Sequence, residues 1–154
     1  MMATDTLPRF EECTCLAVRQ AARHITQFYD QHLTPFGLRT TQFSILAKLK
    51  QLGPMTINAL ADEMVMDRTT LGRNILPLER EGLLSIAPGP TDRRSKELRL
   101  TDAGIERLRA ARRGWREAQA QFAAAFGDER ACGLRALLGE VSATELPTES
   151  ATSG

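Results

Sequence analysis

The hydrophobic pattern of this 154-residue chain changes its period just after Gly82. Before that point apolar residues recur at three- and four-residue steps, which is typical of amphipathic helices. After it, LLSIAP and KELRLT resemble two short strands, in which Leu98 and Leu100 alternate with polar neighbours. The order of helices and strands predicts a mostly α fold with a small β-wing.

Two longer helices are expected before the change of period. The first covers about residues 10–33 and stops before Pro35, and the second covers about 41–52 and stops before Gly53.

Two short helices follow them. Thr56 is a good N-cap for the first, because its hydroxyl can accept a free amide N–H of the opening turn. Val65 and Met66 form a brief connector, and Asp67 is the N-cap of the next helix, which ends near Gly82. Two helices joined by a tight turn and followed by a hairpin predict a winged helix-turn-helix.

Two further helices are expected after the hairpin. Thr101 or Asp102 caps a long helix that continues to about Phe126, and a last helix covers roughly 129–142. The tails, residues 1–9 and 144–154, are predicted to be flexible.

The helix that starts at Asp67 carries an unusual polar face. Its exposed members are hydroxyl, guanidinium and amide side chains: Thr69, Thr70, Arg73 and Asn74. These groups match base edges in the major groove of DNA, where Arg reads guanine, Asn reads adenine and Thr can also contact the thymine methyl. Simple solvation of this face is the competing interpretation.

The loop between the strands, PGPTDRRSKE, carries Arg93, Arg94 and Lys96. A thin loop with arginine at its tip can enter a minor groove. We expect Asp92 to hold a neighbouring arginine through a charge-assisted hydrogen bond. A solvated hairpin tip is the alternative, because residues 56–100 contain as many acidic as basic side chains.

The stretch TINALADEMVMDRTTLGRNILPLEREGLLSIAPGPTDRRSKELRLTDAG resembles the DNA-binding core of the MarR family of bacterial transcriptional regulators. Its DRR wing is followed by the pattern LxLTxxG, and the resemblance covers about residues 10–142. It implies a single domain in which 39–101 form a winged helix-turn-helix DNA-binding lobe. Residues 10–34 and 102–142 would form the helical dimerisation platform.

The resemblance also implies a function. The chain would be a homodimer that binds a pseudo-palindromic DNA operator, acts as a repressor and is not an enzyme. Arg94 matches the wing arginine that enters the minor groove, and Asp92 matches the aspartate that steadies it. The positions where family members meet DNA correspond to Thr56, Arg68, Thr69, Thr70, Arg73 and Asn74, with Arg93 beside them in the wing.

Family members respond to small molecules, typically aromatic or phenolic acids, that bind between the dimer platform and the DNA-binding lobe. The candidates for a carboxylate partner are Arg19, Arg23 and His24, with Phe28 and Phe43 as an apolar wall. In the competing interpretation these arginines are solvated or paired across the dimer.

The three cysteines, Cys13, Cys15 and Cys132, are expected to be free thiols in the cytoplasm. Cys15, together with Cys13, is a redox candidate, because it resembles the N-terminal cysteine of the peroxide-sensing members of the family. A small buried hydrophobic residue is the alternative for Cys15.

Two other classes of protein would show different features. A winged-helix protein-interaction module would present an apolar patch in place of the polar face. A thiol enzyme would need His24 or His32 as a base near Cys15. No metal site, cofactor or membrane span is predicted.

Overall fold

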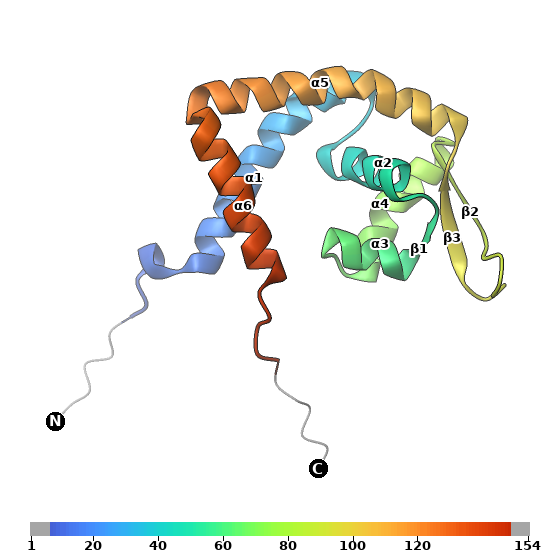
Figure 1. Cartoon of the computed structure of the whole chain (residues 1–154), viewed down its shortest axis with the longest axis horizontal. Coiled ribbons are helices and arrows are strands. Elements are labelled where there is room, and N and C mark those ends of the chain that lie inside the picture. The colour runs from blue at the N-terminus through green and yellow to red at the C-terminus, as the bar shows by residue number, and fades with distance from the viewer. Residues whose placement is uncertain (1–6, 149–154) are drawn as a thin grey trace, which may run out of the picture. The chain divides into compact units, whose positions relative to one another are not determined.

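The computed structural model describes residues 7–148, which form helices and one small sheet (Figure 1). In chain order the elements are η1 (Phe10–Glu12), α1 (Thr14–Leu33), η2 (Thr34–Phe36), α2 (Thr40–Leu52), β1 (Met55–Thr56), α3 (Ile57–Met64), α4 (Arg68–Arg80), β2 (Leu84–Pro88), β3 (Lys96–Leu100), α5 (Asp102–Phe126) and α6 (Asp128–Ala143). The predicted fold class, mostly α with a small β-wing, is confirmed. The chain divides into two compact units, one ending at Ala118 and the other starting at Gln119.

The two ends of the chain carry little regular structure where they are described. Residues 7–9 and 144–148 belong to no helix or strand, and residues 1–6 and 149–154 lie outside the described residues. The expected flexibility of the tails therefore stays a prediction.

The first long helix starts later than the sequence predicts. Residues Phe10–Glu12 form a single 3-10 turn, and the α-helix begins only at Thr14. Cys13 interrupts the helical path because its backbone is extended, with φ −86° and ψ 104°. Its thiol accepts the backbone N–H of Leu16 at 3.3 Å, so Cys13 takes the N-cap position that the sequence analysis did not assign to it.

The predicted caps of the two short helices are confirmed. The Thr56 hydroxyl accepts the N–H of Ala59 at 3.1 Å, and the Asp67 carboxylate accepts the N–H of Thr70 at 2.8 Å. The Thr101 hydroxyl caps the start of α5 by accepting the N–H of Gly104 at 3.0 Å. Each cap satisfies an amide that the first turn leaves without a partner.

The sheet has three antiparallel strands in the order β1-β3-β2. Leu84 pairs with Leu100 and Pro88 with Lys96, so the two predicted strands form an antiparallel hairpin. The third strand, β1, was not predicted, because two residues are too few to show a strand period.

The hydrophobic core of the first unit is assembled from α1, α2, α3, α4, the sheet and α5. Its largest fully buried side chains are leucines and one isoleucine: Leu33, Leu38, Ile45, Leu46, Leu60, Leu71, Leu78, Leu83, Leu84 and Leu98. This core supports α4 and the sheet from the inside, so that their outer faces are free to meet a partner.

Two glycines let α5 approach its neighbours closely. A Cβ at Gly104 would lie 2.0 Å from the carbonyl oxygen of Leu83, and one at Gly114 would lie 2.1 Å from that of His32. Both distances are far shorter than any van der Waals contact. Glycine at these two positions therefore fixes α5 against α1 and against the start of β2.

The second unit leaves several large apolar side chains in water. On α6, Leu137, Leu138 and Val141 are 59%, 40% and 51% exposed. In the same unit the ring of Phe126 stacks on Phe122 and lies under the Arg130 guanidinium. Within residues 7–148, no helix is long and apolar enough to cross a membrane.

Candidate nucleic-acid interface

The turn between α3 and α4 is closed by Val65 in the left-handed conformation, with φ 51° and ψ 48°. Its N–H donates to the carbonyls of Ala61 and Asp62, and the N–H of Met66 donates to Ala61 at 2.9 Å. These bonds end α3 and redirect the chain within two residues. The turn thereby sets the direction of α4 relative to α3.

The N-terminus of α4 is organised by Asp67. Besides capping the Thr70 N–H, its carboxylate accepts the Thr70 hydroxyl at 2.7 Å. Hydrogen bonds from the Thr70 backbone and then from its hydroxyl hold the pKa of Asp67 below its usual value. Asp67 is therefore a fixed negative charge at the helix start, and the Thr70 hydroxyl proton is already engaged.

Asn74 is engaged within α4 as well. Its side-chain amide donates to the carbonyl oxygen of Thr70 at 2.9 Å, and the residue is half-buried. These bonds use one N–H of Asn74 and the hydroxyl proton of Thr70, which leaves the second N–H and the oxygen of the Asn74 amide and the lone pairs of the Thr70 hydroxyl for contacts with bases. This arrangement is not evident from residue types alone.

One stripe of α4 faces solvent without such bonds. It lies opposite the buried Leu71, Ile75 and Leu78, and its four exposed members follow one another at helical spacing: Thr69, Arg73, Leu76 and Arg80. We call Thr69, Arg73, Leu76 and Arg80 the reading stripe. Arg68, the first residue of α4, is also exposed but lies outside this stripe. Leu76 and Arg80 were not predicted as members of this face, although their spacing from Thr69 and Arg73 would have revealed them.

The wing loop between β2 and β3 is built around Asp92. One carboxylate oxygen accepts the backbone N–H of Arg94 at 2.9 Å, and the Asp92 carbonyl accepts the Ser95 hydroxyl at 2.8 Å. The sequence predicted a bond from this carboxylate to an arginine side chain, whereas in the free chain the carboxylate accepts the arginine backbone N–H. Asp92 therefore shapes the loop that presents both arginines.

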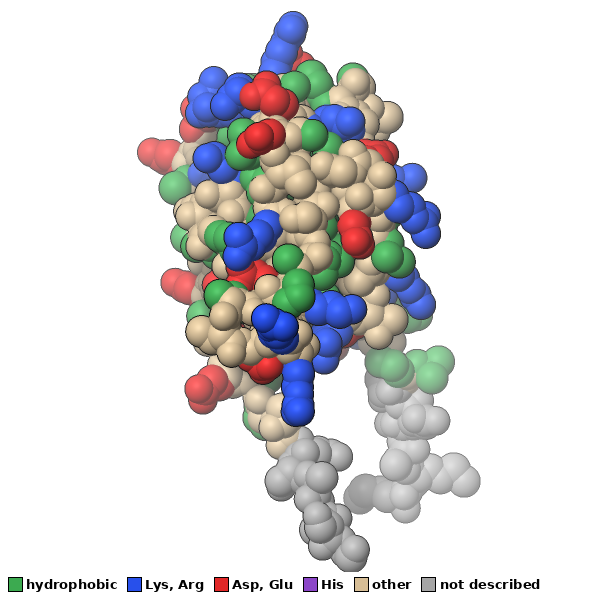
Figure 2. All heavy atoms as spheres, turned by 90° about the vertical axis from the view of Figure 1, so that its right-hand side faces the viewer, with side chains coloured by type: hydrophobic (Ala, Val, Ile, Leu, Met, Phe, Trp, Pro, Cys, Tyr) green, Lys and Arg blue, Asp and Glu red, His purple; other side chains and the backbone are tan. Residues whose placement is uncertain are grey.

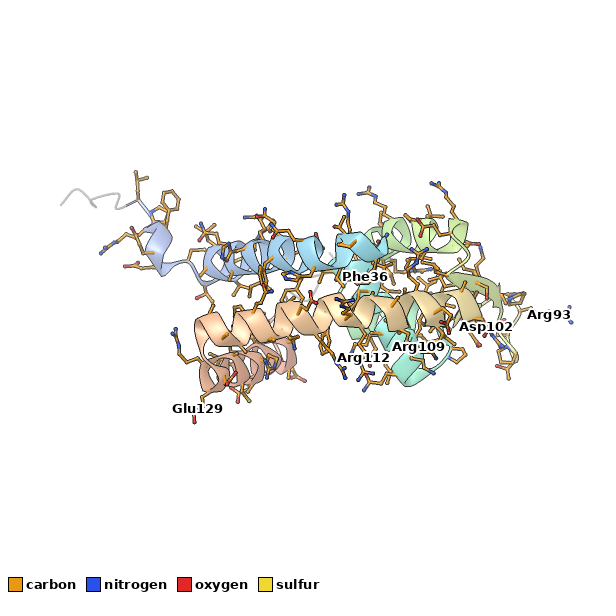
Figure 3. The ribbon with its side chains drawn as sticks, turned by 90° about the horizontal axis from the view of Figure 1, so that it is seen from above. Phe36, Arg93, Asp102, Arg109, Arg112 and Glu129 are labelled. Carbon is orange, nitrogen blue, oxygen red and sulfur yellow. The ribbon has the colours of Figure 1, made fainter. Side chains whose placement is uncertain are left out.

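The wing arginines are free to reach a ligand. Arg93 and Arg94 are exposed, and Arg93 extends from the outer end of the wing (Figure 3). The face that carries the wing shows Lys and Arg side chains with acidic side chains among them (Figure 2). Attraction to a polyanion therefore depends on which side chains project furthest, because the net charge of this region is small.

Comparison with known proteins decides the family. The pattern of the MarR family matches residues 38–96. The HTH-type transcriptional regulator PecS of Dickeya dadantii is 30% identical over 120 residues, which cover 76% of this chain and 72% of PecS. The chain belongs to the MarR family. It is a DNA-binding transcriptional regulator, as its relatives are, and such regulators are not enzymes.

Other relatives agree with this assignment to the MarR family. The structure of the M. tuberculosis transcriptional regulator MosR in complex with DNA is 39% identical, with a TM-score of 0.73, and the match covers 85% of this chain and 96% of MosR. An uncharacterized HTH-type regulator of Bacillus subtilis, YwoH, is 34% identical over 84 residues, or 54% of this chain. That match covers 61% of YwoH, which is less than two thirds of its length.

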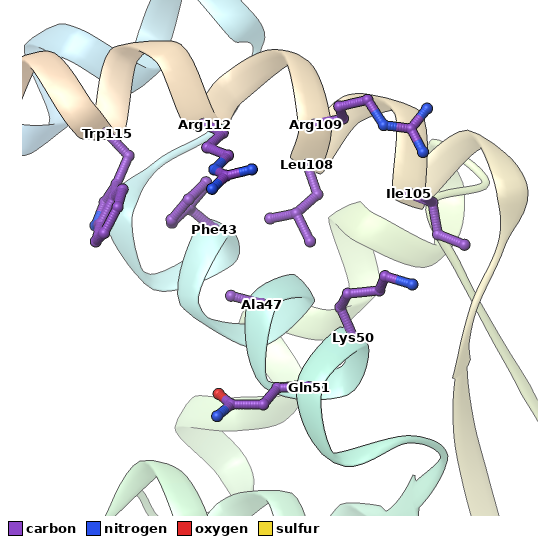
Figure 4. A pocket seen from close by; sticks show the side chains of 9 residues that line it. All are labelled: Phe43, Ala47, Lys50, Gln51, Ile105, Leu108, Arg109, Arg112 and Trp115. Carbon is purple, nitrogen blue, oxygen red and sulfur yellow. The ribbon is translucent and has the colours of Figure 1, made fainter.

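A second feature of this MarR-family chain is a pocket of about 540 Å³ between α2 and α5 (Figure 4). Its lining comes from one face of each helix: Phe43, Ala47, Lys50, Gln51, Ile105, Leu108, Arg109, Arg112 and Trp115. The rings of Phe43 and Trp115 stack with centroids 6.2 Å apart, and Leu108 points from α5 toward α2. The result is an apolar pocket with basic side chains in its lining.

The basic side chains of the pocket differ in their pairing. Arg109 forms an ion pair with Glu106 on its own helix. Within residues 7–148, neither Lys50 nor Arg112 forms an ion pair. These two cations are therefore available to an anionic ligand.

Only one of the predicted ligand residues lines this pocket. Phe43 does, whereas Arg19, Arg23 and His24 are exposed on α1. Phe28 is half-buried on α1 with its ring against that of His32. Arg112 and Trp115 were not predicted as ligand residues, although both fall at helical spacing from Leu108 and Ile105 on one face of α5.

The thiols have a simple environment. Cys13, Cys15 and Cys132 are all free and exposed. In the single chain, Cys15 is therefore not a buried hydrophobic residue. Among the described residues, no cluster of His, Cys, Asp and Glu could hold a metal ion.

Proposed function

We propose that this regulator is a homodimer that binds a pseudo-palindromic operator and represses transcription until a small aromatic acid releases it. The observation that carries the DNA-binding part is that the reading stripe of α4 and the arginine-tipped wing project from one compact unit. The groups proposed to contact DNA are Thr56, Arg68, Thr69, Thr70, Arg73 and Asn74, with Arg93 and Arg94 in the wing and Asp92 supporting them.

In the proposed complex, Thr69 and Arg73 lie against base edges in the major groove, where their side chains can donate and accept hydrogen bonds. Arg94 enters the neighbouring minor groove, whose negative potential favours a guanidinium. Free amides at the start of α4 bind phosphate. Because acidic and basic side chains balance, specificity depends on position and not on total charge.

The proposed dimer rests on the exposed apolar residues of the second unit. Leu137, Leu138 and Val141 need a cover, and a second copy of the chain supplies one of matching chemistry. Two reading stripes related by a twofold axis would then lie about 34 Å apart, one turn of the duplex.

The operator contacts can be tested with fragments of DNA from upstream of the gene, in a mobility-shift assay at several salt concentrations. We expect Arg94→Ala to weaken specific binding by about 1–3 kcal/mol per half-site. Arg99→Ala is the matched control, because Arg99 lies in the same hairpin but is paired with Glu97 at 3.0 Å. If Arg94→Ala and Arg99→Ala lost the same affinity for the operator, the wing arginine would not be part of the proposed interface. Salt-insensitive, weak binding would favour a protein-interaction module instead.

The effector site is proposed to be the pocket between α2 and α5. A flat aromatic ring fits the apolar wall of Phe43 and Trp115, and its carboxylate fits Lys50 and Arg112. This proposal replaces Arg19, Arg23 and His24 as the carboxylate partners, because those residues do not line the pocket.

Trp115 is the only tryptophan of the chain, so its fluorescence reports on this pocket directly. Benzoate and 4-hydroxybenzoate are suitable probes. We expect binding to change the Trp115 emission and Arg112→Ala to weaken it about tenfold, whereas Arg23→Ala, which also removes one arginine charge, leaves it unchanged. If Arg23→Ala weakened probe binding and Arg112→Ala did not, the effector site would lie on α1. A bound probe that leaves operator affinity unchanged would contradict its role as an effector.

A redox switch is the second candidate, favoured by the exposure of Cys13 and Cys15 and by the Cys13 thiol that caps α1. Peroxide would oxidise the Cys13 thiol to a sulfenic acid, being itself reduced to water, and so alter the group that caps α1. The expected result is loss of operator binding on peroxide treatment, recovery with a reducing agent, and resistance in Cys13→Ser, whose hydroxyl can keep the cap; Cys15→Ser tests whether the second thiol takes part. Cys132→Ser, which removes the third exposed thiol, serves as the control, and equal sensitivity of all variants would exclude the switch.

A further inference from the structure

Leu76 is the one apolar member of the reading stripe. It is 50% exposed, and it lies three residues after Arg73 and four before Arg80 on the face of α4 opposite the core. Single exposed leucines are common on protein surfaces and usually need no explanation. This one differs because its neighbours on the stripe are the arginines and threonine that would meet a polyanion.

The chemistry of leucine restricts what it can contact in a major groove. Its side chain neither donates nor accepts a hydrogen bond. Against the amino, carbonyl or ring-nitrogen groups of a base edge it would displace water without replacing the lost bond. The thymine methyl is the only apolar group that base pairs present in this groove.

We infer that Leu76 contacts the C5-methyl group of a thymine in the operator and selects thymine over cytosine at that position. The inference rests on the proposed binding of α4 in the major groove. Leu76 follows Thr69 by seven residues, or about 10 Å along the helix. The selected thymine therefore lies about three base pairs from the base that faces Thr69.

Replacing thymine by deoxyuridine tests this contact, because the change removes only the methyl group and preserves base pairing. Each thymine of the footprinted operator is replaced in turn, and the affinity of the wild type and of Leu76→Ala is measured. We expect the wild type to lose about fourfold in affinity at one thymine position per half-site, as for one buried methyl group. Leu76→Ala should bind the unmodified operator more weakly and should not distinguish thymine from deoxyuridine there.

Leu52→Ala is the matched control. Leu52 is 49% exposed and ends α2, so its truncation removes the same atoms at the same exposure away from α4. It should retain the full sensitivity to deoxyuridine. Alanine favours helix, so Leu76→Ala should remain folded.

The outcomes separate the two levels of the proposal. If the wild type binds the operator specifically, but the effects of Leu76→Ala and deoxyuridine simply add at every thymine, the inference about Leu76 is wrong. If the wild type shows no sequence preference at all, the proposed operator binding is wrong as well.

Discussion

Val65 is a β-branched residue held at φ 51°, and replacing it with glycine should stabilise the protein. Left-handed backbone brings the Cβ atom too close to the following carbonyl, so most L-residues avoid it. Within residues 7–148, Val65 is the only residue other than glycine with a positive φ. The hydrogen bonds that close the turn involve its backbone N–H, which glycine retains.

The expected gain follows from three opposing contributions. The left-handed conformation costs an L-residue about 1–2 kcal/mol, and a β-branched side chain lies at the upper end. Glycine destabilises the folded state by about 0.5–1 kcal/mol, because it increases the conformational entropy of the unfolded chain. Because the valine side chain is 77% exposed, its removal loses no more than about 0.5 kcal/mol of burial. The net result is a stabilisation of roughly 0.5–1 kcal/mol, or a rise in Tm of about 1–4 °C.

Thermal and urea unfolding at one fixed protein concentration would measure this change in the free energy of unfolding. Val65→Ala is the matched control, because it removes the branch but keeps the Cβ atom that causes most of the strain. Its gain should be smaller than that of Val65→Gly. If glycine destabilises the protein, or if alanine stabilises it equally, then the strain assigned to this turn is wrong.

Three further predictions concern packing, charge and assembly. Gly114→Ala should destabilise the protein by about 1–3 kcal/mol in the same unfolding assay, because the added methyl would lie 2.1 Å from the His32 carbonyl oxygen. Gly133→Ala is the control on α6. Its added methyl meets nothing within 4 Å, so this change should be neutral or stabilising by up to about 1 kcal/mol. NMR titration should give Asp67 a pKa below its usual 3.8, so its contribution to stability is present above that value and is lost as the pH falls through the folded pKa; an ordinary or raised pKa would contradict the observed capping bonds. Leu138→Lys should shift the protein toward monomer in sedimentation, whereas Leu52→Lys, at similar exposure on α2, should not; a wild-type protein that is already monomeric would refute the proposed dimer.

The sequence predicted the elements well where local chemistry decides them. Caps are local, so Thr56 and Asp67 could be assigned from their own side chains and the periodic residues that follow, and the cap of the long helix could be narrowed to Thr101 or Asp102. The hairpin was found because the spacing of Leu98 and Leu100 differs from any helical spacing. Cys13 escaped notice as a cap because a thiol is not among the usual capping groups.

The site was less predictable because it depends on which bonds the side chains form. Residue types suggested that Thr70 and Asn74 are free to read bases, yet Thr70 already donates its hydroxyl proton to Asp67 and Asn74 donates one N–H to the Thr70 carbonyl. The pocket depends on the pairing of α2 with α5, which no spacing within one helix reveals. Arg112 was therefore overlooked, whereas Arg19 and Arg23 on α1 were chosen for their charge alone.

The position of α2 offers a physical route from the proposed effector site to the proposed DNA surface. One face of α2, which includes Phe43 and Ala47, lines the pocket, and the helix also packs against α4. Leu46 and Leu49 of α2 belong to the same core cluster as Leu71 of α4. A close-packed core transmits a shift of one helix to the next, since it holds little free volume. A ligand in the pocket can release DNA only by binding more tightly to an arrangement of α2 and α5 that misplaces α4. Substitutions that fill the pocket, such as Ala47→Leu, would therefore be expected to change operator affinity without any effector present.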